Sequence, residues 1–153
     1  MRICNIPNLH LIVMGDGIRR NEFEKMSKGL NVTFLGMLPY HQMCGVLVAC
    51  DIVVNPIVGT SVASIINKHA DYAASGKPVL NTQNSEEYRE LVEEYKMGFN
   101  CSDFDSLVNN LCLLIDNKEL RIAMGDRARK CAKERFNREE SYKKLLKLIY
   151  WER

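Results

Sequence analysis

Short uninterrupted apolar runs alternate along this chain with longer segments in which apolar residues recur every three or four positions. Uninterrupted runs are typical of strands buried on both faces, and the longer period is typical of amphipathic helices. The pattern predicts strands at 9–14, 32–35, 52–54, 78–80 and 98–101. It predicts helices at 18–29, 40–50, 62–75, 85–95, 104–115, 118–135 and 138–151.

Strands that alternate with helices across short turns indicate a parallel sheet with helices on both faces. The length of 153 residues fits one domain, and 46% hydrophobic with 26% charged residues is average for a globular protein. We therefore expect an α/β fold of the Rossmann-like, three-layer type. Ligands of such folds bind at the carboxyl ends of the strands, here residues 15–18, 36–38, 55–61 and 81–85.

The composition of the chain excludes several classes of protein. A net charge of +2 gives no reason to expect nucleic acid as a partner. The longest apolar stretch, Val46 to Val54, is interrupted by Asp51 and is far shorter than the roughly 18 residues of a transmembrane helix. The N-terminus lacks the apolar stretch of a signal peptide. Six cysteines without a CxxC pair, and without a histidine at metal-ligand spacing, predict reduced thiols, no metal site and a cytoplasmic protein.

The predicted helix at 62–75 carries the most informative polar residues. Ser64, Asn67, Lys68, Asp71 and Ser75 fall on one face at steps of three and four. The plain interpretation is a solvated polar face. In the functional interpretation, small loop residues let backbone N–H groups at the helix start approach a phosphate. Lys68 would then add positive charge, and Asp71 would accept hydrogen bonds from a ribose.

Other sequence motifs for chemistry are weak or absent. Gly15-Asp16-Gly17 follows the first strand, but no GxGxxG fingerprint is formed, so a tight turn is the plain interpretation. The Walker lysine motif, GxSxG and HExxH are missing, and no nucleophile is paired with a base. No catalytic residue is therefore assigned. The histidines are interpreted as structural: His10, His41 and His69.

Four segments occur in the order seen in one enzyme group: LIVMGDGIRRNEFEKM, NVTFLGMLPYHQM, CDIVVNP and INKHADYAASGKPVLNT. With the closing MGDRARKCAKERFNREESYKKLLKLIY, they resemble the C-terminal, donor-binding domain of the retaining glycosyltransferases of family four. The resemblance covers nearly the whole chain and implies one half of a two-domain GT-B fold. It also implies a nucleotide-sugar donor, a glycan or lipid-linked sugar as acceptor, and no metal or other cofactor.

The resemblance bears on single residues of the helix at 62–75. The family often carries two glutamates eight positions apart, of which the second matches Asp71 and the first falls on Ala63, which cannot replace it. Asn67-Lys68 is similar to a branch common among bacterial surface-polysaccharide transferases. A proline usual in that branch is Ile66 here.

A donor site can be written down from these observations. The diphosphate would meet the helix dipole and the backbone of the loop before it, with Lys68, and Asp71 would hold the ribose. The resemblance implies that the nucleobase lies against Met37 and Leu38. The expected donor-binding residues are Gly15, Asp16, Gly17, Met37, Leu38, Thr60, Ser61, Ser64, Lys68 and Asp71.

By the same resemblance, the chain lacks the first strand–helix unit of the donor domain and the whole N-terminal acceptor domain. Two other functions stay open. One is a nucleotide-binding α/β module or remnant without catalysis, and the other is a nucleotide-sugar epimerase of the same architecture. An epimerase would offer extra acid and base residues, and the sequence contains no such cluster. An adjacent reading frame for the acceptor domain would favour the transferase.

The last predicted helix, at 138–151, is amphipathic. It has a broad apolar stripe ending at Trp151 and lysines on its other side. We expect its start to pack on its own domain and its end to be an exposed apolar patch, through which the chain self-associates. A basic amphipathic helix also permits peripheral association with the inner face of an anionic membrane.

Overall fold

The computed structural model describes residue 6, residues 9–57 and residues 65–151 of the chain. Two compact units are present, residues 1–46 and residues 47–153, and their boundary falls inside helix α2 (Tyr40–Ala49). The strands form one two-stranded and one three-stranded sheet, and every strand pair is parallel. Parallel strands flanked by helices confirm the predicted α/β fold class.

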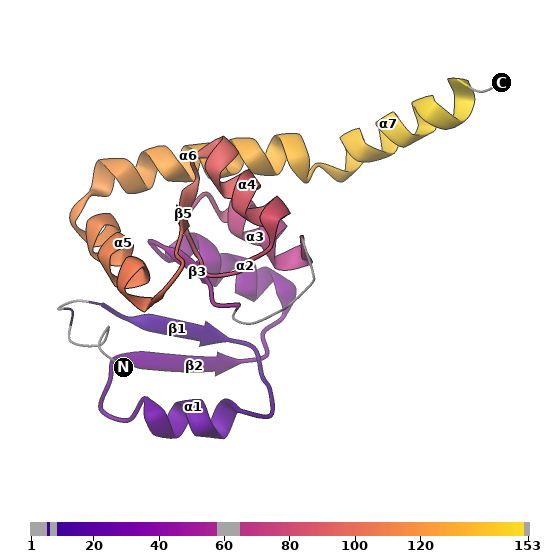
Figure 1. Ribbon diagram of the computed structural model, residues 1–153. Helices are drawn as coiled ribbons and strands as arrows, with labels where there is room; N and C mark the ends of the chain where they lie inside the picture. The colour runs from indigo at the N-terminus through magenta and orange to yellow at the C-terminus, as the bar shows by residue number, and fades with distance from the viewer. Residues whose placement is uncertain (1–5, 7–8, 58–64, 152–153) are drawn as a thin grey trace. The chain divides into compact units, whose positions relative to one another are not determined.

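The first unit is a small parallel sheet with one helix (Figure 1). β1 (Leu11–Met14) pairs with β2 (Val32–Gly36), and α1 (Arg20–Met26) connects the two strands. The unbroken apolar run of β1 predicts burial on both faces, but all four residues of β1 are only half-buried. The reason is that two strands and one seven-residue helix supply too few side chains to cover a strand completely.

The second unit is built on a three-stranded sheet in the order β3-β4-β5. α6 packs against α3 and α4, and α5 packs against β4 (Figure 1). The elements are β3 (Val53–Asn55), α3 (Asn67–Ser75), β4 (Val79–Asn81), α4 (Glu86–Tyr95), β5 (Gly98–Asn100), α5 (Phe104–Asp116), α6 (Lys118–Arg135) and α7 (Arg138–Trp151).

The apolar core lies in this second unit. Leu80 of β4, Val92 of α4 and Leu114 of α5 have no exposed surface. Each such side chain contributes roughly 1.5–3 kcal/mol when it is removed from water. These buried side chains fix the strands in place, and with them the residues at the strand ends.

Two glycines let α6 approach the end of α3 closely. Gly76 ends α3 in the left-handed conformation, at φ 69°, which glycine adopts without a steric penalty. A Cβ placed on Gly125 of α6 would lie 2.2 Å from the Gly76 carbonyl oxygen. A side chain at position 125 would therefore push the two helices apart.

Polar side chains cap the starts of α4 and α5. The Ser85 hydroxyl accepts a hydrogen bond from the Tyr88 N–H, and the Asp103 carboxylate accepts one from the Ser106 N–H.

The helix predicted at 62–75 begins later than its pattern indicates. α3 starts at Asn67, because Ile66 has an extended backbone with φ −120° and ψ 161°. The predicted polar face is also wrong at its end. Ser75 is buried and its hydroxyl donates to the Tyr72 carbonyl at 2.7 Å, while Ala74 is exposed.

The described residues contain five cysteines, all free thiols, and no group of His, Cys, Asp and Glu side chains that could hold a metal ion. None of the helices in the described part of the chain has the length and apolar character needed to cross a membrane.

Candidate functional site

Each strand of the three-stranded sheet ends in an asparagine, and the register sets these three residues side by side. Asn55 of β3 lies opposite Asn81 of β4, which lies opposite Asn100 of β5. The Asn55 Nδ2 donates to Asn81 Oδ1 at 2.8 Å, and the Asn81 Nδ2 donates to Asn100 Oδ1 at 2.8 Å. The Asn100 Nδ2 continues the row to the Glu93 carboxylate at 2.8 Å. We call Asn55, Asn81 and Asn100 the asparagine row.

The asparagine row is nearly saturated with hydrogen bonds. The second Nδ2 proton of Asn55 goes to Gln83 Oε1, that of Asn81 to the Gln83 carbonyl, and that of Asn100 to the Arg89 carbonyl. Asn55 Oδ1 is different, because it is buried and has no partner among the described residues. A buried acceptor of this kind costs about 1–3 kcal/mol when it stays unpaired.

His69 of α3 is fully buried beside the asparagine row. Its Nδ1 accepts the Ile66 N–H at 3.2 Å, so a neutral ring carries its proton on Nε2, which donates to Gln83 Oε1 at 3.0 Å. The Asn55 Nδ2 lies 3.3 Å from the His69 Nε2. Both Nδ2 protons already bond to Asn81 and Gln83, so this is a contact between two donors. The ring stacks on Tyr88, with centroids 3.5 Å apart and planes 6° apart.

Burial lowers the pKa of His69 to about 4, with the hydrogen bond that the ring donates to Gln83 acting against the shift and nearby Lys68 adding to it. The imidazole is therefore neutral at physiological pH. The prediction that His69 is structural agrees with this environment.

α3 is the helix that follows β3 in the chain. Its start carries positive charge without an acidic residue in the first turn. No side chain in the described part of the chain caps its N2 or N3 N–H group. Lys68 adds a cation at the positive end of the helix dipole, which is unfavourable unless an anion is bound. Burial lowers the pKa of Lys68, which has no ion-pair partner within the described residues. Asp71 is half-buried and lies one turn further along α3.

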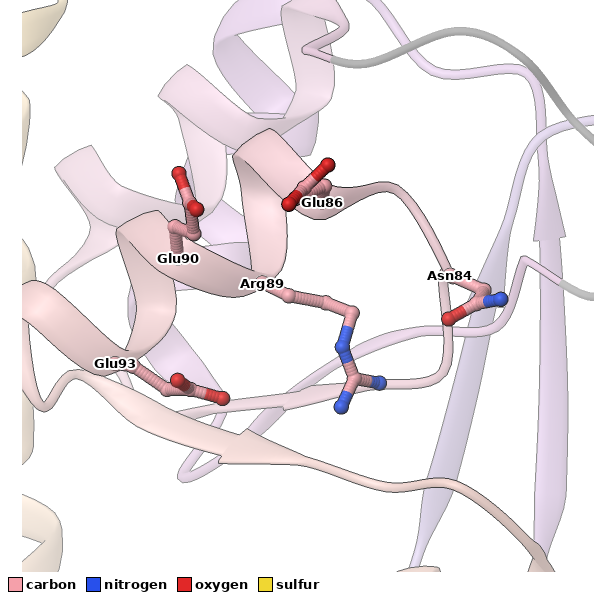
Figure 2. Close-up of a pocket in the computed structure, with 5 residues that line it drawn as sticks. All are labelled: Asn84, Glu86, Arg89, Glu90 and Glu93. Atoms are coloured by element: carbon pink, nitrogen blue, oxygen red, sulfur yellow. The ribbon is translucent and has the colours of Figure 1, made fainter.

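A polar pocket opens beside the other end of the asparagine row (Figure 2). It measures about 420 Å³ and is lined by Asn84, Glu86, Arg89, Glu90 and Glu93. Arg89 extends from α4 toward the loop that carries Asn84 (Figure 2). With three carboxylates and one guanidinium, the pocket suits neutral polar groups better than a phosphate. None of the residues predicted as site residues lines it.

The predicted glycine turn of the first unit follows β1. Gly15 has φ 113° and its N–H donates to the Gly36 carbonyl at 2.8 Å, which joins the ends of β1 and β2. The Asp16 carboxylate accepts the Gly17 N–H at 2.8 Å. The Arg20 guanidinium of α1 lies 3.8 Å from the Asp16 carboxylate. Arg20 is not among the residues that the sequence predicts for the site.

The remaining predicted residues fall into two groups. Met37 is largely exposed and Leu38 is half-buried, both just after β2. Thr60, Ser61 and Ser64 lie outside the described residues. The backbone donors that can be described at the start of α3 are therefore those of Asn67 and Lys68.

Comparisons with known proteins bear on the fold and the family of this chain. Curated protein sequences give no match. Among solved structures, Anabaena HepE in complex with UDP has a TM-score of 0.76 and 21% identity over 94% of this chain and 41% of its own. WaaG, a glycosyltransferase involved in lipopolysaccharide biosynthesis, has a TM-score of 0.68 and 23% identity over 82% of this chain and 34% of its own. Sucrose-phosphate synthase from Thermosynechococcus elongatus has a TM-score of 0.78 and 17% identity over 99% of this chain and 41% of its own.

These likenesses confirm the predicted fold, one half of the GT-B type, and this chain spans about two fifths of the length of HepE and of the synthase. A family model described as "Glycosyl transferases group 1" matches residues 1–117. The match covers more than half of the 153 residues, so the chain belongs to the group 1 glycosyl transferases.

Proposed function

We propose that this chain is the donor-binding half of a retaining glycosyltransferase of family four, of the type that builds bacterial surface polysaccharides. The complete enzyme would move a sugar from a nucleotide-sugar to a glycan or lipid-linked acceptor. HepE, to which the fold is similar, has been crystallised with UDP and with UDP-glucose, and this supports a nucleotide-sugar donor.

The observation that carries the proposal is the positive charge at the start of α3, for which the described residues supply no acidic partner in the first turn. The helix dipole, the N–H groups of Asn67 and Lys68, which no described side chain caps, and the half-buried Lys68 ammonium all favour an anion there. The diphosphate of a nucleotide-sugar supplies that anion. The pocket beside α4, with three carboxylates, would repel it.

The chemistry of transfer requires stabilisation of the leaving group. As the bond between the anomeric carbon and the diphosphate breaks, negative charge builds on the diphosphate oxygens. Preorganised N–H groups and a cation lower the energy of that state more than that of the bound donor. The position of the N–H groups of Asn67 and Lys68 at the start of α3 supports this role.

Further donor contacts are part of the proposal. Asp71 would accept hydrogen bonds from the ribose, and the turn at Gly15-Asp16-Gly17 would border the sugar-diphosphate. Met37 and Leu38 would support the nucleobase. Thr60, Ser61 and Ser64, which lie outside the described residues, would add backbone donors.

The domain organisation is also a proposal. The chain spans about two fifths of the length of HepE and of the synthase, which supports the expectation that a further strand–helix unit and an acceptor domain belong to the complete enzyme. A cytoplasmic location, peripheral to the membrane, fits the free thiols of the described cysteines.

Isothermal calorimetry with UDP, GDP and inorganic diphosphate tests the donor site. We expect weak binding to the chain alone and no sugar transfer by it. Lys68→Met should weaken nucleoside diphosphate binding by roughly tenfold or more, since a charge-assisted hydrogen bond is worth about 1.5–3 kcal/mol.

Lys77→Met is the matched control. Lys77 is half-buried just after the other end of α3, so the variant makes the same change of charge away from the proposed site. Equal loss of binding in both variants would contradict the proposal, because it would mean that only the net charge matters.

A further inference from the structure

We propose that His69 is a positioning residue for the donor site, whose neutral imidazole fixes the first turn of α3 and thereby aims the Asn67 and Lys68 donors at the diphosphate. The inference rests on the proposed function and adds the residue that shapes the site. His69 is given no contact with the ligand, so it is not a catalytic residue.

His69 replaces the usual caps of a helix start. Ile66, the residue before α3, has no side-chain acceptor, and within the described residues the His69 N–H bonds to the Ile66 carbonyl, at 2.9 Å. In return, the His69 Nδ1 accepts the Ile66 N–H at 3.2 Å. This is the backward reach that a glutamate or glutamine makes from the third helical position in a capping box.

The use of an imidazole here has an electrostatic consequence. A glutamate in the same role would place a negative charge in the first turn and would repel a diphosphate. The neutral imidazole satisfies the Ile66 N–H without that charge. The Ile66 N–H at the helix start thus has an acceptor, while the helix dipole and the Lys68 ammonium stay available to an anion.

The imidazole is held firmly enough to act in this way. Its other nitrogen donates to Gln83, its ring stacks on Tyr88, and it has no exposed surface. Gln83 in turn accepts from Asn55, whose other Nδ2 proton goes to Asn81. The first turn of α3 is therefore tied, through His69, to the ends of β3 and β4.

Two variants test the cap. His69→Gln keeps an acceptor at the third helical position, which can reach back to the Ile66 N–H as in a capping box. His69→Leu has no acceptor and loses the cap. Both are uncharged, and both remove the stacking on Tyr88, so they form a matched pair.

The readouts are amide hydrogen exchange at Ile66 and the UDP-induced NMR shift of the Lys68 amide in the full chain. We expect His69→Leu to raise exchange at Ile66 and to weaken UDP binding by about fivefold to tenfold, the equivalent of one lost hydrogen bond. His69→Gln should stay closer to the wild type in both readouts. UDP binding that is equal in all three proteins would overturn the inference, and so would equal losses in both variants.

The wild-type chain provides a test that needs no variant. Its Ile66 amide should exchange more slowly than the Asn67 amide, which is the first helical N–H and has no intrahelical partner. Equal exchange rates would overturn the inference even if both variants failed to fold. If UDP shifts nothing in the wild type, the proposed function fails, and the donor role of His69 falls with it. The Ile66 exchange rate then still decides whether His69 holds the start of α3.

Discussion

Acidification should destabilise the chain through His69 well before its carboxylates are protonated. An unfolded histidine titrates near pH 6.5, whereas burial lowers the pKa of His69 to about 4. Between these values the unfolded chain binds a proton that the folded chain does not, so the free energy of unfolding falls as the pH falls. A difference of this size is worth about 3 kcal/mol in total, of which about 2 kcal/mol is lost on going from about pH 7.5 to about pH 5.

The structural cause of this loss is specific. A second proton on His69 would sit on Nδ1 and face the Ile66 N–H, so a hydrogen bond of 3.2 Å would become a contact between two donors. The new charge would also be buried against Tyr88 and near the Lys68 ammonium. Because small domains are stable by only about 5–15 kcal/mol, a loss of about 2 kcal/mol is easily measured.

Urea unfolding at a series of pH values is the assay, and His69→Phe is the control. Phenylalanine keeps a ring that can stack on Tyr88 but has no titrating nitrogen, so all other groups contribute equally to both proteins. We expect the free energy of unfolding of the wild type to fall by about 2 kcal/mol more than that of the variant between about pH 7.5 and about pH 5. Parallel curves would refute the assignment of a buried, neutral His69.

Three further outcomes are expected. Gly125→Ala should destabilise the chain by about 1–3 kcal/mol in urea unfolding, because its Cβ meets the end of α3. Gly45→Ala, which has open space around its Cβ, should cost nothing, and equal effects of the two variants would contradict the close helix contact. In a complete enzyme, Asp71→Asn should raise the KM for the donor more than that for the acceptor, and equal changes would mean that Asp71 only supports structure. Leu148→Glu and Trp151→Glu should each make the chain more monomeric in light scattering, and an unchanged mass would exclude association through α7.

The self-association prediction is changed in one respect by the structure. The start of α7 was expected to pack on its own domain, but Tyr142 is 63% exposed, and every described side chain from Arg138 to Tyr150 is exposed. The reason is that no described element packs extensively against α7. The apolar stripe therefore runs along the whole helix and gives association a larger surface than the sequence indicates.

Helix positions were predictable wherever a polar cap marks the helix start. Ser85 directly precedes α4 and Asp103 directly precedes α5, and each side chain caps the helix that follows it. The start of α3 could not be placed in this way. Ile66 carries no capping signal, and the side chain that completes the turn, His69, lies inside the helix.

The asparagine row could be predicted only in part. The strands VVN, VLN and GFN each end in asparagine, which is visible in the sequence, and their carboxyl ends were expected to form the binding edge. That the three side chains bond to one another depends on the register between strands, which no local pattern specifies. The pocket beside α4 was not predicted either, because in the sequence its residues look like an ordinary charged face of a helix.

An NMR titration of the labelled full chain with UDP tests whether a nucleoside diphosphate binds at the start of α3. We expect the largest amide shifts at Asn67 and Lys68, with saturation at a UDP concentration on the order of millimolar, and we expect these shifts to be lost in Lys68→Met but kept in Lys77→Met. Shifts centred on Arg89 in the pocket beside α4, or no shifts at all, would contradict this expectation.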